Sequence, residues 1–213
     1  MARKSKVSDE QLKQIIEAAI FVSDTPLSLE KLQTTVLEGL NVGPRKLKAL
    51  MASVQGDYAA RGIHLVEVAS GYRFQSDESL NPWISKLWQE SAPKYSRALL
   101  ETLSLVAYRQ PITRGEIEDV RGVSVSSHIM KTLVERDWIK VVGHKEVPGR
   151  PALYATTKGF LDYFSLKSLD ELPSMGLFEQ QAQDARKQII EPVEPQVESG
   201  SVNEKQDEEL TNE

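Results

Sequence analysis

The feature that most constrains the fold of this chain is a weak internal repeat with an offset of 85 residues. Residues 26–28 (proline, leucine, serine) recur as residues 111–113 (proline, isoleucine, threonine), and the later Leu32 recurs as Ile117. Each proline ends a helix because it has no amide hydrogen, and the hydroxyl residue that follows can cap the next helix. The repeat therefore predicts the same structural unit twice in the chain.

The helices on both sides of the proline also match between the two copies. Glu116 lies three residues after Thr113, which completes a capping box in the second copy, and Ser8 with Gln11 can form another in the first. The apolar residues of the preceding helices fall on one face: Leu12, Ile15, Ile16, Ala19 and Ile20 in the first copy, and Leu99, Leu103, Val106 and Ala107 after Ser96 in the second.

Each copy then changes from helical to strand periodicity. A third helix is predicted after residues 43–44 and another after Gly122, the latter burying Val125, Ile129, Leu133 and Val134. Alternating residues predict one hairpin from 63–68 and 72–74, and a second from 139–142 and 152–155, with closing helices at 81–88 and 157–164. This order is typical of a winged-helix domain. We expect a mainly α fold with small β-hairpins (α+β), built as two tandem winged-helix domains.

The expected domains are an N-terminal winged-helix domain at 1–90, a C-terminal one at 91–168 and a largely disordered acidic tail at 169–213. The tail is rich in acids, proline and small polar residues, with a possible short helix at 179–188. From Phe178 onward the net charge is −7, whereas the preceding residues carry +2. Because the body is nearly neutral, strong electrostatic binding of DNA is not expected.

Catalytic chemistry finds little support in the sequence. The chain has no cysteine, and its three histidines (His64, His128 and His144) are not in metal-ligand spacing. Phosphate-binding and nucleophile-elbow motifs are absent, and capping or solvation explains Glu116, Glu118 and Asp119. No apolar run approaches the roughly 18 residues of a membrane-spanning helix. We expect a soluble, cytoplasmic protein that is not an enzyme and has no cofactor, metal or membrane contact.

Two uses of a winged helix remain, namely binding DNA and binding protein. The second hairpin is basic (Lys140, His144, Lys145 and Arg150, diluted by Glu146), so weak phosphate contact is conceivable and a DNA-binding transcription regulator stays the alternative. The first helix is apolar on more than one side, which indicates either deep burial or a shared interface. The same two interpretations hold for Trp83, Ile84, Leu87 and Trp88.

At these residues the chain resembles the segregation and condensation protein B family over roughly residues 8–166. The matching segments are 16–21 (IEAAIF) with 26–28, 71–75 (GYRFQ), 101–114 (ETLSLVAYRQPITR), 116–123 (EIEDVRGV), 133–136 (LVER) and 147–151 (VPGRP).

The resemblance implies a non-enzymatic subunit of the bacterial SMC–kleisin complex, which condenses and segregates the chromosome. It also implies a homodimer formed through the N-terminal domains, which binds the kleisin segregation and condensation protein A and, through it, the SMC ATPase. Such a subunit would be cytoplasmic and nucleoid-associated, with weak or indirect DNA contact. Expected kleisin-binding residues are Tyr108, Arg109, Arg114, Glu116, Arg121, Arg150 and Pro151, and expected dimer contacts are Ile16, Ile20 and Phe21.

Overall fold

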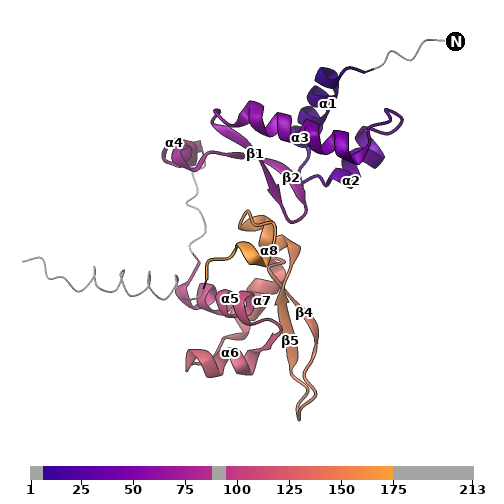
Figure 1. Cartoon of the computed structure of the whole chain (residues 1–213). Helices are drawn as coiled ribbons and strands as arrows, with labels where there is room; N and C mark the ends of the chain where they lie inside the picture. The colour runs from indigo at the N-terminus through magenta and orange to yellow at the C-terminus, as the bar shows by residue number, and fades with distance from the viewer. Residues whose placement is uncertain (1–6, 88–94, 175–213) are drawn as a thin grey trace, which may run out of the picture. The chain divides into compact units, whose positions relative to one another are not determined.

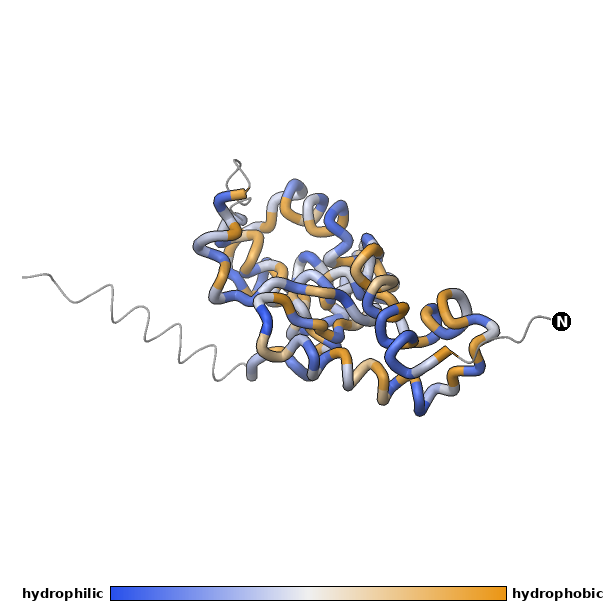
Figure 2. Tube along the Cα trace, turned by 90° about the horizontal axis from the view of Figure 1, so that it is seen from above, coloured by the Kyte–Doolittle hydropathy of each residue, from blue (hydrophilic) through white to orange (hydrophobic). Residues whose placement is uncertain are grey.

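The computed structural model describes residues 7–87, called the first half below, and residues 95–174, called the second half (Figure 1). The expected joint near residue 90 and the helix expected at 179–188 lie outside the described residues. The chain is rich in α-helices and has small antiparallel sheets, as predicted. Apolar and polar residues alternate along the helices, as they do in amphipathic segments (Figure 2). No helix in the described ranges is long and apolar enough to cross a membrane.

The first half contains three helices followed by a hairpin. Their bounds are α1 Asp9–Val22, α2 Leu29–Lys31 (continued by a π-helical turn, Leu32–Val36), α3 Pro44–Tyr58, β1 Ile63–Val68, β2 Gly71–Ser76 and α4 Asn81–Ile84. The core is formed by α1, the α2 region, α3 and the hairpin, and its fully buried members include Ile16, Leu32, Leu47 and Val54. This core accounts for the apolar stripe predicted on the first helix.

The second half repeats this order around its own core. Its elements are α5 Arg97–Arg109, β3 Ile112–Thr113, α6 Arg114–Arg121, α7 Ser127–Glu135, β4 Ile139–His144, β5 Ala152–Thr156 and α8 Lys158–Tyr163. The strands form a sheet in the order β3–β5–β4, in which all neighbours are antiparallel. Trp138, Ile117 and Leu133 are buried at its centre. The short strand β3 was not predicted, because its two residues also lead into a helix cap.

The predicted helix caps are present in the structure. Ser8 and Gln11 form a capping box at α1, and Thr113 and Glu116 form one at α6. Thr157 caps α8 as expected. Each cap satisfies amide groups that the first helical turn leaves without partners.

One expectation about helices is wrong and another is confirmed. The closing helix expected at 81–88 is present over the described residues 81–87, as α4 followed by a 3-10 helical turn (Ser85–Leu87), and its Trp83 and Leu87 are 65% and 78% exposed. Val134 is half-exposed, because Met130 and Leu133 form the buried stripe of α7. Val125 is buried as expected, although it precedes α7.

The turn of the first hairpin lies directly against the chain that leaves α1. Gly71 has a φ of +143°, and a Cβ atom at this position would lie 2.3 Å from the carbonyl carbon of Leu27. Leu27 and Tyr72 exchange two backbone hydrogen bonds, each 2.9 Å long. Glycine is needed here because the backbone conformation and the lack of space both exclude a side chain.

Candidate functional site

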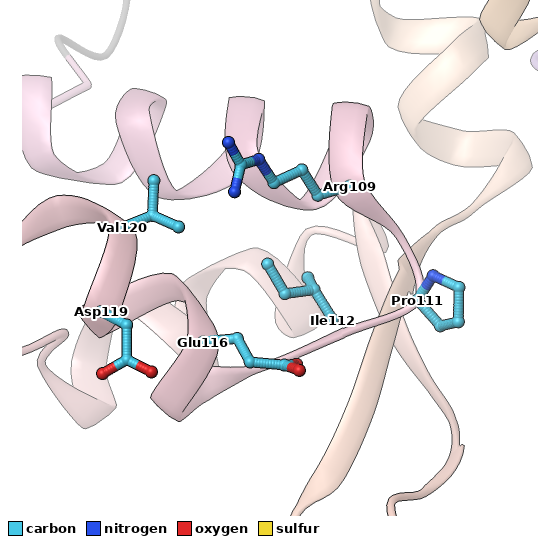
Figure 3. A pocket seen from close by; sticks show the side chains of 6 residues that line it. All are labelled: Arg109, Pro111, Ile112, Glu116, Asp119 and Val120. Carbon is cyan, nitrogen blue, oxygen red and sulfur yellow. The ribbon is translucent and has the colours of Figure 1, made fainter.

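Two of the expected kleisin-binding residues, Arg109 and Glu116, line a groove beside the end of α5 and along α6. The groove has a volume of about 310 Å³ and is lined by Arg109, Pro111, Ile112, Glu116, Asp119 and Val120 (Figure 3). Arg109 extends over it from α5, whereas Glu116, Asp119 and Val120 come from α6. The groove thus combines an apolar lining with charges of both signs.

The connection from α5 to α6 is held in place by side chains on both sides of Pro111. Gln110 accepts hydrogen bonds from the backbone N–H and the hydroxyl of Thr156 on β5, at 2.8 and 3.0 Å. Its side-chain amide donates to the carbonyl of Ala107 at 3.0 Å. These bonds tie the end of α5 to the sheet, so the position of the neighbouring Arg109 backbone is fixed.

Glu116 is fully occupied by partners inside the second half. Its Oε2 accepts hydrogen bonds from the backbone N–H and the hydroxyl of Thr113, both at 2.8 Å. Its Oε1 accepts a hydrogen bond from Lys145 Nζ at 2.5 Å, which links the start of α6 to the β4–β5 hairpin. Lys145 first, and then Thr113, lower the pKa of the Glu116 carboxyl to about 2. Both oxygens therefore serve the fold.

Arg109 and Asp119 differ from Glu116 because their charges are unpaired. Within the described part of the chain neither side chain has a hydrogen bond or an ion pair, and both residues are exposed. Val120, which also lines the groove, is 45% exposed. The groove thus has a free cation, a free anion and an apolar surface.

Two further expected binding residues have partners within the chain. Arg114 donates from Nε to Glu118 Oε1 at 3.0 Å and from Nη1 to the Ser127 hydroxyl at 3.3 Å. Arg121 donates to Glu101 Oε2 at 3.1 Å, and only 9% of its side chain is exposed. Arg121 is therefore not a free surface cation, because its guanidinium pairs with Glu101 of α5.

The remaining expected kleisin-binding residues lie at the hairpin and at the end of α5. Arg150 is exposed and forms an ion pair with Glu146 at 3.0 Å, and Pro151 beside it is partly buried. Tyr108 is also partly buried. The groove lining, in contrast, includes Asp119 and Val120, which the sequence did not single out as binding residues.

The three residues expected at a dimer contact divide into two groups. Ile16 and Ile20 are almost fully buried in the first-half core, so they cannot contact a partner while the fold is intact. This burial corrects the expectation for those two positions. Phe21 is 72% exposed at the end of α1, and Val22 beside it is also exposed. Only Phe21 of the three is therefore available to another chain.

Across residues 7–87 and 95–174, no three acidic, histidine or cysteine side chains are arranged to hold a metal ion. His64 does contact Asp77 at 2.8 Å, and hydrogen bonds from Ser79 and His64 lower the pKa of Asp77 to about 2. That pair joins β1 to the turn after β2 and has a structural role.

Comparison with known proteins gives the family. Residues 14–175 match the family model described as "Segregation and condensation complex subunit ScpB", which spans well over half of the chain. The chain belongs to the ScpB family. A segregation and condensation protein B homolog from Coxiella burnetii is 54% identical over 169 residues, covering 79% of this chain and 81% of that protein. Segregation and condensation protein B from Syntrophotalea carbinolica is 38% identical over 170 residues, covering 79% and 84%.

Two solved ScpB structures also align with this ScpB-family chain. ScpB from Mycobacterium tuberculosis is 32% identical, with a TM-score of 0.34, over 75% of this chain and 98% of that one. A structure described as the dimer of an ScpB N-terminal domain complexed with an ScpA peptide is 29% identical, with a TM-score of 0.31. It covers 38% of this chain and 93% of that one.

Proposed function

We propose that this ScpB-family chain is a non-catalytic subunit of the bacterial SMC–kleisin complex. It forms a homodimer and binds the kleisin segregation and condensation protein A, and through the kleisin it joins the SMC ATPase. In this role it supports chromosome condensation and segregation during cell division, in the cytoplasm and in association with the nucleoid. The observation that carries the kleisin-binding role is the groove of the second half, in which two unpaired charges lie beside the exposed Pro111 and Val120.

Each half is proposed to be a winged-helix domain. Three helical segments followed by an antiparallel hairpin support this in both halves, as do the two separate cores. We assign residues 1–90 to an N-terminal domain for dimerisation, 91–168 to a C-terminal domain for kleisin binding, and 169–213 to an acidic tail. The exposed side chain of Phe21 supports the dimerisation role of the first domain.

The charge pattern favours this function over that of a DNA-binding regulator. A regulator would need free cations on α7 and on the β4–β5 hairpin to contact phosphates. Two of the hairpin cations, Lys145 and Arg150, are paired with Glu116 and Glu146, at 2.5 and 3.0 Å, and only Lys140 is exposed without a partner among the described residues of the hairpin's lysines and arginines. Lys131 on α7 is 3.6 Å from Glu135. The acids that compensate these cations would also repel a phosphate backbone.

The direct test is the mass of the full chain in solution, measured by light scattering with and without the central segment of the kleisin from the same organism. We expect twice the chain mass of 23.9 kDa, and a further increase when the segment is added. A mass that does not change with the segment would contradict the kleisin-binding role. A dimer that ignores the segment but retains a specific duplex DNA, and not one of random sequence, would favour the regulator.

A further inference from the structure

The residues that line the groove beside α6 indicate the chemistry of its ligand in more detail than membership of the ScpB family does. Its lining contains Pro111, Ile112 and Val120 as apolar surface, with Arg109 on one side and Asp119 on the other (Figure 3). Its volume of about 310 Å³ is at the small end of the range for ligand pockets. One or two side chains of a partner fill a space of this size.

We propose that this groove binds a linear segment of the kleisin with an apolar side chain flanked by one acidic and one basic residue. The acidic residue pairs with Arg109 and the basic residue with Asp119, so these two residues determine which segment binds and in which direction. This inference rests on the proposed function, since it takes the kleisin as the partner. It adds the position of the site and the chemistry of the bound segment.

The first argument is that the two charges are free whereas their neighbours are not. Glu116 lies in the same groove, but Thr113 and Lys145 use both of its oxygens. Within the described residues, Arg109 and Asp119 have no such partners. A charged partner can therefore pair with them without breaking an existing interaction, which makes its binding less costly.

The second argument is that the opposite signs exclude simpler ligands. A phosphate or another anion would gain from Arg109 but would be repelled by Asp119 and Glu116. A cation would gain from Asp119 and Glu116 but would be repelled by Arg109. A peptide carries both signs on neighbouring side chains, and its apolar residue can cover Val120, which is now 45% exposed. Charge complementarity of this kind selects one partner and one orientation among many.

The test measures binding of the fluorescently labelled kleisin central segment to the full-length chain by anisotropy. The groove variants are Arg109→Glu and Asp119→Lys. The matched controls are Lys158→Glu and Asp24→Lys, which make the same charge changes at exposed positions outside the groove. We expect each groove variant to bind about tenfold more weakly, because an exposed pair contributes up to about fivefold and its reversal adds repulsion. The controls should bind as the unmodified chain does.

A charge-exchange experiment then identifies the partner residue. Each basic residue of the kleisin segment is changed to glutamate in turn, and we expect one of these peptides to regain binding to Asp119→Lys. Binding of both groove variants at control strength would overturn the inference and leave the proposed function intact. Failure of the unmodified chain to bind the segment would instead overturn the proposed function.

Folding of the variants is checked by thermal unfolding, and the neutral variants Arg109→Gln and Asp119→Asn provide a second measurement. These keep the size of each side chain and remove only the charge, so they should weaken binding by up to about fivefold without added repulsion. If the charge-reversed variants bind more weakly but the neutral variants bind fully, Arg109 and Asp119 do not pair directly with the kleisin segment.

Discussion

Replacing Gly71 with alanine tests how closely the first hairpin packs against the chain after α1. The new Cβ would lie 2.3 Å from both the carbonyl carbon and the oxygen of Leu27, and 2.5 Å from the amide nitrogen of Ser28. All three are backbone atoms, so no side-chain rotation can relieve the overlap. The φ of +143° is also one that alanine adopts only under strain.

The expected loss in the free energy of unfolding has two sources. Holding a non-glycine residue in such a conformation costs about 1–3 kcal/mol. Moving Leu27 away breaks its two backbone hydrogen bonds with Tyr72, at about 0.5–1.5 kcal/mol each. The total is about 2–6 kcal/mol, a large fraction of the stability of a small domain.

The assay is urea unfolding followed by circular dichroism, with hydrogen exchange of residues 63–76 to identify the first half. A loss of this size lowers the midpoint by about 1 M or more, given a slope of about 1–3 kcal/mol per molar urea. Gly56→Ala is the matched control, because its Cβ meets open space on α3 and the change should stabilise by about 0.5–1 kcal/mol. Equal midpoints for Gly71→Ala and the unmodified chain would refute the packing argument.

Three further predictions concern the site and the dimer. Thr113→Ala removes the cap of α6 and should cost about 1–2 kcal/mol in urea unfolding. Because the pKa of Glu116 is lowered from 4.5 to about 2, its contribution to stability is complete above pH 4.5 and is lost as the pH falls through 2. In Glu116→Gln the urea midpoint should change less between pH 4.5 and pH 2 than it does in the unmodified chain. An equal change in both would contradict this role of Glu116. Phe21→Asp should reduce the mass in light scattering to that of one chain, whereas a dimer that persists would exclude Phe21 from the interface.

Local features of the fold were predictable from the sequence because their causes lie within a few residues. The Thr113–Glu116 capping box is formed by residues three positions apart, so the sequence pattern alone indicates it. The hairpin at residues 63–76 likewise follows from alternation on both sides of a short turn. The closing helix predicted at 81–88 is present over 81–87, but its second part is a 3-10 turn and Trp83 is 65% exposed, which the sequence did not indicate.

The candidate site was predictable only in part, because residues distant in the sequence can determine whether a charged side chain is paired or free. Arg109 and Arg114 both lie in segment 101–114, which resembles the family, and the sequence does not distinguish them. In the structure Arg114 is paired with Glu118, whereas Arg109 has no partner among the described residues. Glu116 finds its partner Lys145 on the hairpin 29 residues later. The four-residue spacing of Arg114 and Glu118 on one helix could have predicted that pair, whereas no spacing rule predicts the pair between Glu116 and Lys145. The exposure of Asp119 could have been suspected from its place on the polar side of α6.

The link from Thr113 through Glu116 to Lys145 makes side-chain length, in addition to charge, a property that must be kept at position 116. One oxygen faces the start of the helix and the other faces the hairpin. Aspartate has the same charge but is one methylene shorter, so it can reach either partner only by giving up the other. A substitution that is usually considered conservative would separate two contacts that glutamate joins, and the start of α6 would no longer be coupled to the hairpin.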